Sequence, residues 1–187
     1  VIIELKVTEL KKEHTGQIMI YMNYIDKNIK TIVKNVNMKN TNVILGQENI
    51  NIYGDGYIED KLGEFTFKIS PLSFYQVNPI QAEKLYNIGV EMAQISKNDT
   101  VFDLYCGIGT IGMSMASKSG RVLGIELNKQ AVKDAKANAK RNNITNIHFT
   151  AADATQYMMN MAENGQHADV VVMDPPRSGS TEEFVKT

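Results

Sequence analysis

Cysteine, long apolar runs and net charge are all scarce in this sequence of 187 residues. The single cysteine, Cys106, excludes an internal disulfide and a cysteine-ligated metal cluster, and neither His14 nor His148 has a second ligand at metal spacing. No apolar run reaches the roughly 18 residues of a membrane span, and no signal-peptide core is present, so we expect a cytoplasmic protein without a membrane partner. A net charge of −1 does not by itself indicate a nucleic-acid partner.

The first part of the chain, residues 1–71, is predicted to form a small antiparallel α+β subdomain. Short runs of apolar and polar residues are separated by turns, for example at residues 14–16. Ile29, Ile32 and Val36 have helical spacing, which predicts a helix over residues 28–40. The predicted strands cover residues 2–7, 17–25, 43–45, 50–53, 57–60 and 64–69.

A polar, turn-rich joint, SPLSFYQVNP, covers residues 70–79 and sets a domain boundary near residue 72, with a second domain over residues 72–187. Asn78 has the side chain of a helix cap, Pro79 suits the first helical position, and Gln81 stands three residues after the cap. The helix is expected to run to about residue 95. The side chains expected on its buried face are those of Leu85, Ile88 and Met92.

Residues 101–126, VFDLYCGIGTIGMSMASKSGRVLGIE, predict a strand, a glycine turn, a helix and a second strand. Gly107 and Gly109 lack the β-carbon that would keep a ligand away from the backbone of the turn. The start of the helix offers free N–H groups to a negative group. Glu126, nineteen residues after Gly107, can accept hydrogen bonds from both hydroxyls of a ribose. The spacing Gly107-x-Gly109-x-x-Gly112 suits NAD and S-adenosylmethionine alike.

Two further strands, at residues 146–151 and 168–173, alternate with helices at residues 128–141 and 155–164. Parallel strands joined by right-handed crossovers give a doubly wound α/β sheet, in which ligands lie beyond the carboxyl ends of the strands. The residues at or just past those ends are Tyr105, Glu126, Asp153 and Asp174. Their convergence on one crevice indicates a ligand site more strongly than the glycines do.

Asp174 is followed by two prolines, Pro175 and Pro176. Proline fixes its own φ and restricts the preceding residue to extended backbone. We therefore expect Asp174 to be held rigidly at the floor of the crevice, beside the reacting end of the ligand. A dehydrogenase has no particular need for this motif, so Asp174 favours S-adenosylmethionine as the ligand.

Several stretches together resemble the RNA (uracil-C5-)methyltransferases, in particular the branch that acts on ribosomal RNA. They are TNVILG, SFYQVNPIQAEKLY, FDLYCGIGT, GIE and DPPRSG. The resemblance spans most of the chain. It implies a class I S-adenosylmethionine-dependent methyltransferase fold, truncated here, and methylation of C5 of a uridine in RNA, with 23S ribosomal RNA as the expected substrate.

The resemblance also implies which residues bind the cofactor. The family contacts carry over to Gln76, Tyr105, Glu126 and Asp174, and two more variable positions carry over to Thr110 and Asp153. Glu126 suits the ribose hydroxyls, the ring of Tyr105 can pack on the ligand, and Asp153 can accept from the adenine amine. Gln76 would connect the N-terminal subdomain to the cofactor site.

The catalytic groups of the family are not expected within residues 1–187. In the family, a thiolate adds to C6 of uracil and C5 takes the methyl group from the sulfonium; a base then removes the C5 proton and the thiolate leaves C6. The resemblance implies a thiol and a base beyond DPPRSG, while Cys106 is expected to be a small buried residue in the cofactor turn. We therefore expect a fragment that does not methylate alone, and whose residues 170–173 form an apolar sheet edge that favours self-association.

Two alternatives remain open from the sequence alone. The glycine spacing and Glu126 also suit an NAD-dependent oxidoreductase. A non-catalytic RNA-binding module is suggested by the cations of the predicted helix 128–141, which are otherwise expected to form a solvated face. These cations are Lys129, Lys133, Lys136, Lys140 and Arg141, and the inward positions are Ala131, Val132, Ala135 and Ala139.

Overall fold

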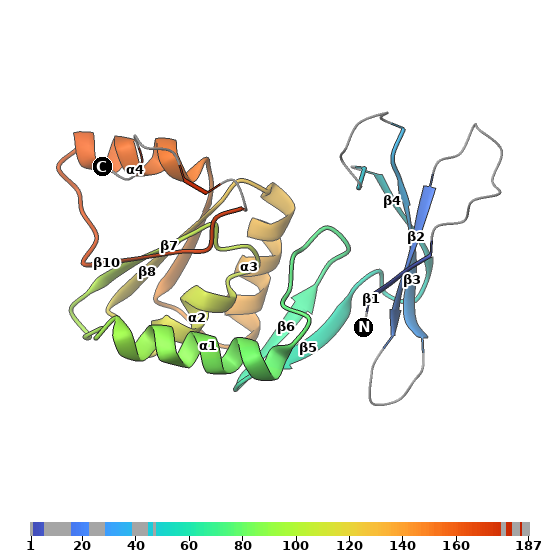
Figure 1. Cartoon of the computed structure of the whole chain (residues 1–187), viewed down its shortest axis with the longest axis horizontal. Coiled ribbons are helices and arrows are strands. Elements are labelled where there is room, and N and C mark those ends of the chain that lie inside the picture. Colours follow the sequence, from blue (N-terminus) through green and yellow to red (C-terminus); the bar gives the residue numbers. More distant parts are fainter. Residues whose placement is uncertain are drawn as a thin grey trace. The chain divides into compact units, whose positions relative to one another are not determined.

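The computed structural model describes residues 2–5, 16–22, 29–38, 45–46, 48–176, 179–180 and 184. It divides the chain into two compact units, which are described separately (Figure 1). Unit 1 comprises Val1–Asp60 and Lys68–Leu72, and unit 2 comprises Lys61–Phe67 and Ser73–Thr187. The domain boundary near residue 72 stays a prediction, because compactness does not show that either part folds by itself. His14, most of the predicted turn at 14–16 and most of the predicted strand at 43–45 lie outside the described residues.

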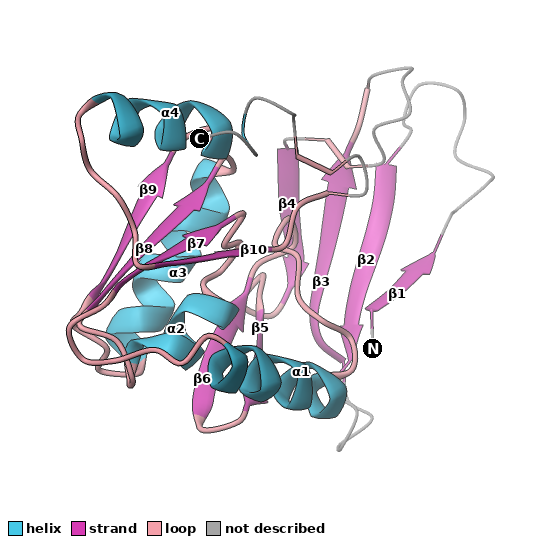
Figure 2. Cartoon of the chain, turned by 60° about the vertical axis from the view of Figure 1, so that its left-hand side comes forward, coloured by secondary structure: helices cyan, strands magenta, loops and turns pink. Residues whose placement is uncertain are grey.

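Unit 1 contains a four-stranded antiparallel sheet in the order β1-β2-β3-β4 (Figure 2). Its strands are β1 (Ile2–Leu5), β2 (Gly16–Met22), β3 (Ile29–Val36) and β4 (Glu48–Tyr53). The prediction of a helix over residues 28–40 is therefore wrong. The buried face of β3 consists of Thr31, Val33 and Asn35, so two of its three residues are polar and the apolar pattern does not show the two-residue period.

Hydrogen bonds make that polar face of β3 compatible with burial. The Thr31 hydroxyl donates to the carbonyl of Tyr53 at 2.7 Å. The side-chain amide of Asn35 donates to the Gly46 carbonyl at 2.9 Å and accepts from the Gly46 N–H at 2.8 Å. Buried polar groups are tolerated when they are paired in this way. A hairpin of β5 (Ile58–Leu62) and β6 (Phe65–Ile69) follows, and its residues are shared between the two units.

Unit 2 is built on a four-stranded, fully parallel sheet in the order β10-β7-β8-β9. Its strands are β7 (Thr100–Leu104), β8 (Arg121–Glu126), β9 (Ile147–Ala151) and β10 (Val170–Met173). The helices are α1 (Pro79–Met92), α2 (Thr110–Ala116), α3 (Lys129–Arg141) and α4 (Ala154–Glu163). This alternation of strands and helices confirms the predicted doubly wound sheet.

Helices cover both faces of the sheet in unit 2 (Figure 1). On one face, Phe102 and Leu123 are buried with side chains of α4, and the rings of Phe102 and Tyr157 meet edge to face at 6.3 Å. On the other face, α2 approaches Val122 and Ile147 closely at Gly112. The inward positions predicted for α3 are all buried, as expected. None of the helices in the described part of the chain has the length and apolar character that a bilayer crossing requires.

Helix α1 begins as predicted but buries a different face. Asn78 caps it by accepting a 3.2 Å hydrogen bond from the N–H of Gln81, and Pro79 is its first residue. The side chains predicted to be buried, Leu85, Ile88 and Met92, are 63%, 53% and 78% exposed. The buried residues are instead Ala82, Tyr86 and Val90. Both sets have helical spacing, so the bulky apolar side chains misled the prediction.

Candidate cofactor site

Backbone hydrogen bonds bring the carboxyl ends of the four parallel strands into one edge. The N–H of Cys106 donates to the carbonyl of Ile125 at 3.0 Å, and the N–H of Ala152 donates to the carbonyl of Glu126 at 3.1 Å. On the other side, the N–H of Asp174 donates to the carbonyl of Leu104 at 3.4 Å. Among the strand-end residues predicted from the sequence, Glu126 and Asp174 take part in these bonds themselves. The other two, Tyr105 and Asp153, directly follow residues that do.

The carboxylate of Glu126 is held by two backbone N–H groups. Its Oε2 accepts from the N–H of Gly107 at 3.1 Å, and its Oε1 accepts from the N–H of Asn128 at 2.7 Å. Each carboxylate oxygen keeps a second lone pair, so the group can still accept hydrogen bonds from a ligand. The glycine turn and the end of β8 are thereby fixed to each other.

The turn after β7 contains residues in the left-handed region of the backbone. Tyr105 has φ +63°, which is uncommon for a residue with a side chain and marks a position to examine for function. Gly109 caps α2 with φ +87°, and a β-carbon there would lie 2.7 Å from the ring of Phe149. A β-carbon at Gly107 would meet nothing within 4 Å, so the backbone is open at that point. A ligand can therefore approach the turn at Gly107.

Asp103 is a part of this region that the sequence interpretation did not single out as a site residue. Its side chain is fully buried, Oδ2 accepts from the N–H of Gly112 at 2.8 Å, and Oδ1 has no hydrogen-bond partner in the described structure. The pKa of Asp103 is raised to about 7, chiefly because the side chain is buried and also because the carboxylates of Asp174 and Glu126 lie nearby, while the hydrogen bond from Gly112 lowers it. The sequence signal was a carboxylate inside the apolar run VFDL.

Gln76 and Thr110 are both close to a residue that the sequence interpretation did not single out as a site residue. The hydroxyl of Tyr86 on α1 lies 3.5 Å from Oγ1 of Thr110, and its side chain is also hydrogen-bonded to Gln76. Tyr86 is 7% exposed, whereas Gln76 and Thr110 are half-buried. The signals available were the helical spacing of α1, which was assigned to a different face, and the position of Tyr86 at the end of SFYQVNPIQAEKLY.

Asp153 and Asp174 are both exposed at the ends of β9 and β10. One oxygen of Asp153 caps α4 by accepting from the N–H of Gln156 at 3.0 Å, which leaves the other oxygen available. The negative charge of Asp174 acts on both Tyr86 and Asp103, raising the pKa of each. Asp174 therefore lies close enough to Tyr86 and Asp103 for its charge to affect both. Asp153 directly follows Ala152, whose N–H donates to the carbonyl of Glu126.

Cys106 is 5% exposed, as expected for a small buried residue in the turn. Burial raises the pKa of its thiol well above the usual value, and the charges of Asp103 and Glu126 raise it further. A neutral, inaccessible thiol is a poor nucleophile.

Comparison with known proteins agrees with this geometry. Residues 95–181 match a family model described as a methyltransferase domain. The chain is 46% identical over 158 residues to an uncharacterized RNA methyltransferase of Oceanobacillus iheyensis, covering 84% of this chain and 34% of that protein. It is 42% identical over 182 residues to one of Clostridium tetani, covering 88% and 40%. The chain thus spans between about a third and two fifths of the length of these curated relatives.

Solved structures show the same fold. A tRNA (uracil-54, C5)-methyltransferase of Pyrococcus abyssi, in complex with S-adenosyl-L-homocysteine, aligns with a TM-score of 0.68 at 22% identity, covering 91% of this chain and 46% of that one. A putative methyltransferase of Streptococcus mutans that depends on S-adenosylmethionine aligns with a TM-score of 0.54 at 14% identity, covering 68% and 35%. Unit 2 therefore has the class I S-adenosylmethionine-dependent methyltransferase fold, as predicted, and S-adenosylmethionine is the cofactor of that fold.

The residues at the strand ends fit this cofactor chemically. The cofactor carries a ribose, an adenine amine and positively charged sulfonium and ammonium groups. Glu126 and Asp153 provide acceptors, and the buried Asp103 oxygen without a partner lies near the charges of Asp174 and Glu126. A bound cation, such as the sulfonium or ammonium group of the cofactor, would reduce the repulsion among the carboxylates of Asp103, Asp174 and Glu126.

Proposed function

We propose that this chain provides the cofactor-binding domain of an enzyme that methylates C5 of a uridine in RNA, with 23S ribosomal RNA as the expected substrate. The observation that carries the proposal is the convergence of Glu126, Asp174 and the Gly107 turn at one sheet edge, together with the motifs FYQVN and DPPR. The relatives named as RNA methyltransferases and the uracil-C5 tRNA enzyme with the same fold support the RNA substrate. A cytoplasmic location is part of the proposal.

Each strand end has a proposed role in cofactor binding. Glu126, already oriented by two N–H groups, accepts from the ribose hydroxyls. The ring of Tyr105 packs on the ligand, and the free oxygen of Asp153 accepts from the adenine amine. Asp174 and Gln76 hold the end that carries the methyl group. When bound, S-adenosylmethionine supplies an electrophilic methyl group on its sulfonium.

The nucleophile of this reaction is not proposed among residues 1–187. Cys106 is the single thiol of the sequence, and its burial and raised pKa argue against addition to a uracil. We therefore expect the chain to bind the cofactor without transferring a methyl group. Methyl transfer to a uridine-containing RNA by residues 1–187 alone would contradict this part of the proposal.

Calorimetric titration of the chain with S-adenosylhomocysteine tests the cofactor site, and the same titration with NAD tests the oxidoreductase alternative. We expect binding of S-adenosylhomocysteine and none of NAD. Glu126→Gln should weaken binding about tenfold or more, because a charged acceptor to two hydroxyls is removed. Glu163→Gln, at the exposed end of α4, is the matched control and should bind like the unaltered chain. Equal affinity of the two variants would overturn the ribose assignment.

A further inference from the structure

Tyr86 lies at the contact between α1 and α2, between two predicted cofactor residues that belong to different segments. Gln76 lies in the irregular stretch before the Asn78 cap, and Thr110 is the first residue of α2. The Tyr86 hydroxyl is 3.5 Å from Oγ1 of Thr110, and the Tyr86 side chain is hydrogen-bonded to Gln76. One buried hydroxyl therefore links the stretch before α1 to the start of α2.

The surroundings of the Tyr86 hydroxyl determine its protonation state. Burial raises the pKa of Tyr86, and the carboxylates of Asp174 and Asp103 raise it further, while the bonds from Thr110 and Gln76 lower it. The phenol is therefore protonated at neutral pH and can donate one hydrogen bond while accepting others. A buried hydroxyl that loses its partners is costly, so the conformations of Gln76 and Thr110 are restricted in turn.

We propose that Tyr86 is a positioning residue of the cofactor site, whose hydroxyl holds Gln76 and Thr110 in the conformation that binds S-adenosylmethionine. This inference rests on the proposed function, and it adds a residue that is not among the cofactor contacts implied by the family resemblance. Gln76 lies in an irregular segment and Thr110 at a helix start, where a side chain has rotamer freedom to lose on binding. If Tyr86 already restricts the side chains of Gln76 and Thr110 in the free protein, less conformational entropy is lost on binding and the affinity for the cofactor is higher.

The test compares two variants that each remove one hydroxyl. Tyr86→Phe keeps the ring that packs between α1 and α2, and Tyr157→Phe on α4 removes a hydroxyl on the other face of the sheet. Affinity for S-adenosylhomocysteine is measured by calorimetry and folding by thermal unfolding without ligand. We expect Tyr86→Phe to weaken binding about five- to tenfold, as one net hydrogen bond predicts, with Tyr157→Phe unchanged.

A double-mutant cycle distinguishes positioning from simple packing. If Tyr86 acts through Gln76, then Gln76→Ala should cost less affinity in the Tyr86→Phe background than in the unaltered chain. Should Tyr86→Phe fail to fold, the cycle is run on Gln76→Ala and Thr110→Val, whose effects should be non-additive because Tyr86 connects the two residues. Additive effects in the cycle that is run would overturn the inference.

The failures of the inference and of the proposed function are distinguishable. If the unaltered chain binds S-adenosylhomocysteine and Tyr86→Phe binds equally well, the inference is overturned and the proposed function stands. If the unaltered chain does not bind S-adenosylhomocysteine, both are overturned.

Discussion

Oδ2 of Asp103, near the end of β7, accepts a 2.8 Å hydrogen bond from the N–H of Gly112, nine residues later in α2. Both residues are buried, and the bond spans the glycine turn from the strand to the helix. The first N–H groups of a helix have no partner within it, and a carboxylate that accepts from one of them fixes the start of the helix. The conformation of the glycine turn thus depends on this buried pair.

Gly112→Ala should destabilise the fold. Its β-carbon would lie 2.7 Å from Oδ2 of Asp103 and 3.0 Å from the end of Ile147, so the buried pair must separate. We expect a decrease of about 1–3 kcal/mol in the free energy of unfolding in urea, the usual range for overpacking. The matched control is Gly89→Ala in α1, where a β-carbon would meet nothing within 4 Å and the change should stabilise by about 0.5–1 kcal/mol. Equal effects of the two substitutions would contradict the close approach at Gly112.

The buried carboxyl of Asp103 should make stability depend on pH. Its pKa is about 7 in the folded state against a usual value of 3.8, so between these values the folded state holds a proton that the unfolded state has released. Stability therefore falls as pH rises through this window, by up to about 4 kcal/mol at about 1.4 kcal/mol per pKa unit. Asp103→Asn removes the effect and keeps an oxygen for the Gly112 N–H.

The measurement for Asp103 is the difference in unfolding free energy between Asp103→Asn and the unaltered chain. The unfolding free energy of Asp103→Asn, relative to that of the unaltered chain, should increase from about pH 4 to about pH 7 and stay constant at higher pH. Taking the difference cancels the titration of the other carboxyls. Glu163→Gln, an exposed substitution on α4, serves as the control and should show no such rise. A difference that is constant across the range would mean that Asp103 is already ionised in the folded state.

The sequence predicted the strand ends of unit 2 well because each lies next to a strong local signal. Glycines mark the turn before Thr110, a continuous apolar run marks β10, and a run that is apolar apart from Asp103 marks β7. In β3 the signal failed, since Thr31 and Asn35 are buried as hydrogen-bonded polar residues and an apolar count cannot detect them. In such strands, tertiary partners determine which face is buried, and they lie far away in the sequence.

The sequence indicated candidate cofactor residues one by one but not how the structure connects them. Glu126 and Asp174 could be placed by their positions after strands. Tyr86 and Asp103 could not, because their roles depend on the packing of α1 against α2 and on the hydrogen bond to Gly112. Both are buried polar groups within apolar patterns, which suggests searching such patterns for polar exceptions.

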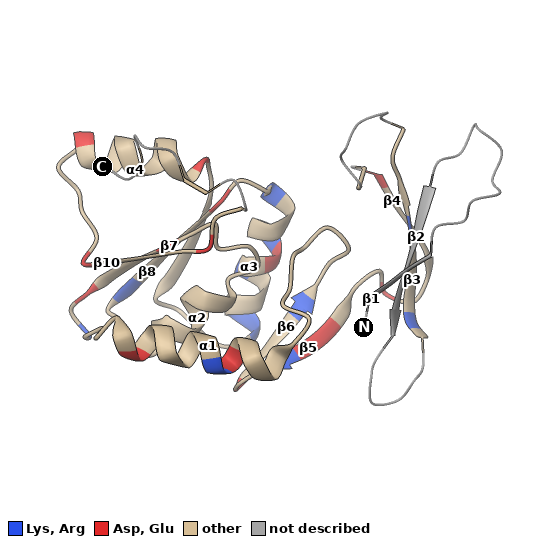
Figure 3. Ribbon diagram, in the orientation of Figure 1, with Lys and Arg blue, Asp and Glu red and all other residues tan. Residues whose placement is uncertain are grey.

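Helix α3 should contribute to RNA binding if RNA is the substrate. Its exposed residues include four lysines (Figure 3), while its acid, Asp134, is buried and accepts from the Ser73 hydroxyl at 3.0 Å. An open cavity of about 550 Å³, lined in part by Lys136 and Lys140, lies between α3 and β9. Replacing both lysines with glutamine should weaken RNA binding and reduce the slope of log affinity against log salt by about 1 for each lysine that binds a phosphate.

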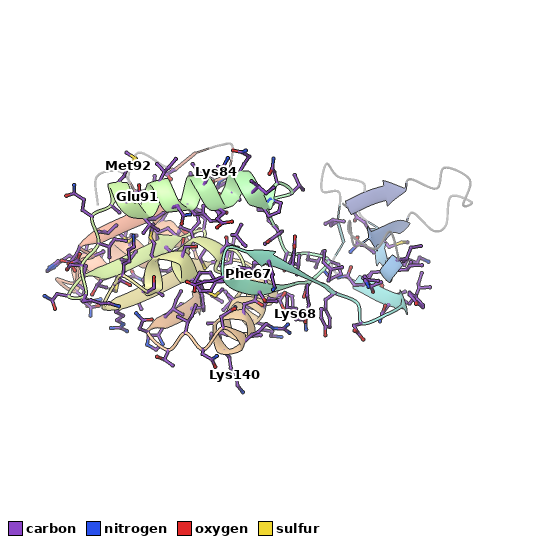
Figure 4. The ribbon with its side chains drawn as sticks, turned by 90° about the horizontal axis from the view of Figure 1, so that it is seen from below. Phe67, Lys68, Lys84, Glu91, Met92 and Lys140 are labelled. Carbon is purple, nitrogen blue, oxygen red and sulfur yellow. The ribbon has the colours of Figure 1, made fainter. Side chains whose placement is uncertain are left out.

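Lys84→Gln is the control for this measurement, because Lys84 lies on α1, on the other side of unit 2 from Lys140 (Figure 4). RNA affinity is followed by fluorescence anisotropy between low and moderate salt, and S-adenosylhomocysteine affinity should be the same in all three proteins. If the double variant and Lys84→Gln have the same salt slope as the unaltered chain, the lysines of α3 form only a solvated face.

The edge strand β10 should make the chain self-associate. It pairs with β7 on one side, and in the described structure it ends the parallel sheet on the other. Its sequence is apolar, and Val171 and Met173 are 43% and 42% exposed, so the edge lacks the charges that usually prevent strand pairing.

Sedimentation velocity should show concentration-dependent dimers or larger species. Val171→Lys should return the chain to a monomer, whereas Met92→Lys, at a 78% exposed apolar residue of α1, should not. A monodisperse monomer at high concentration would show that the β10 edge is protected, and reversal by Met92→Lys alone would assign the association to α1.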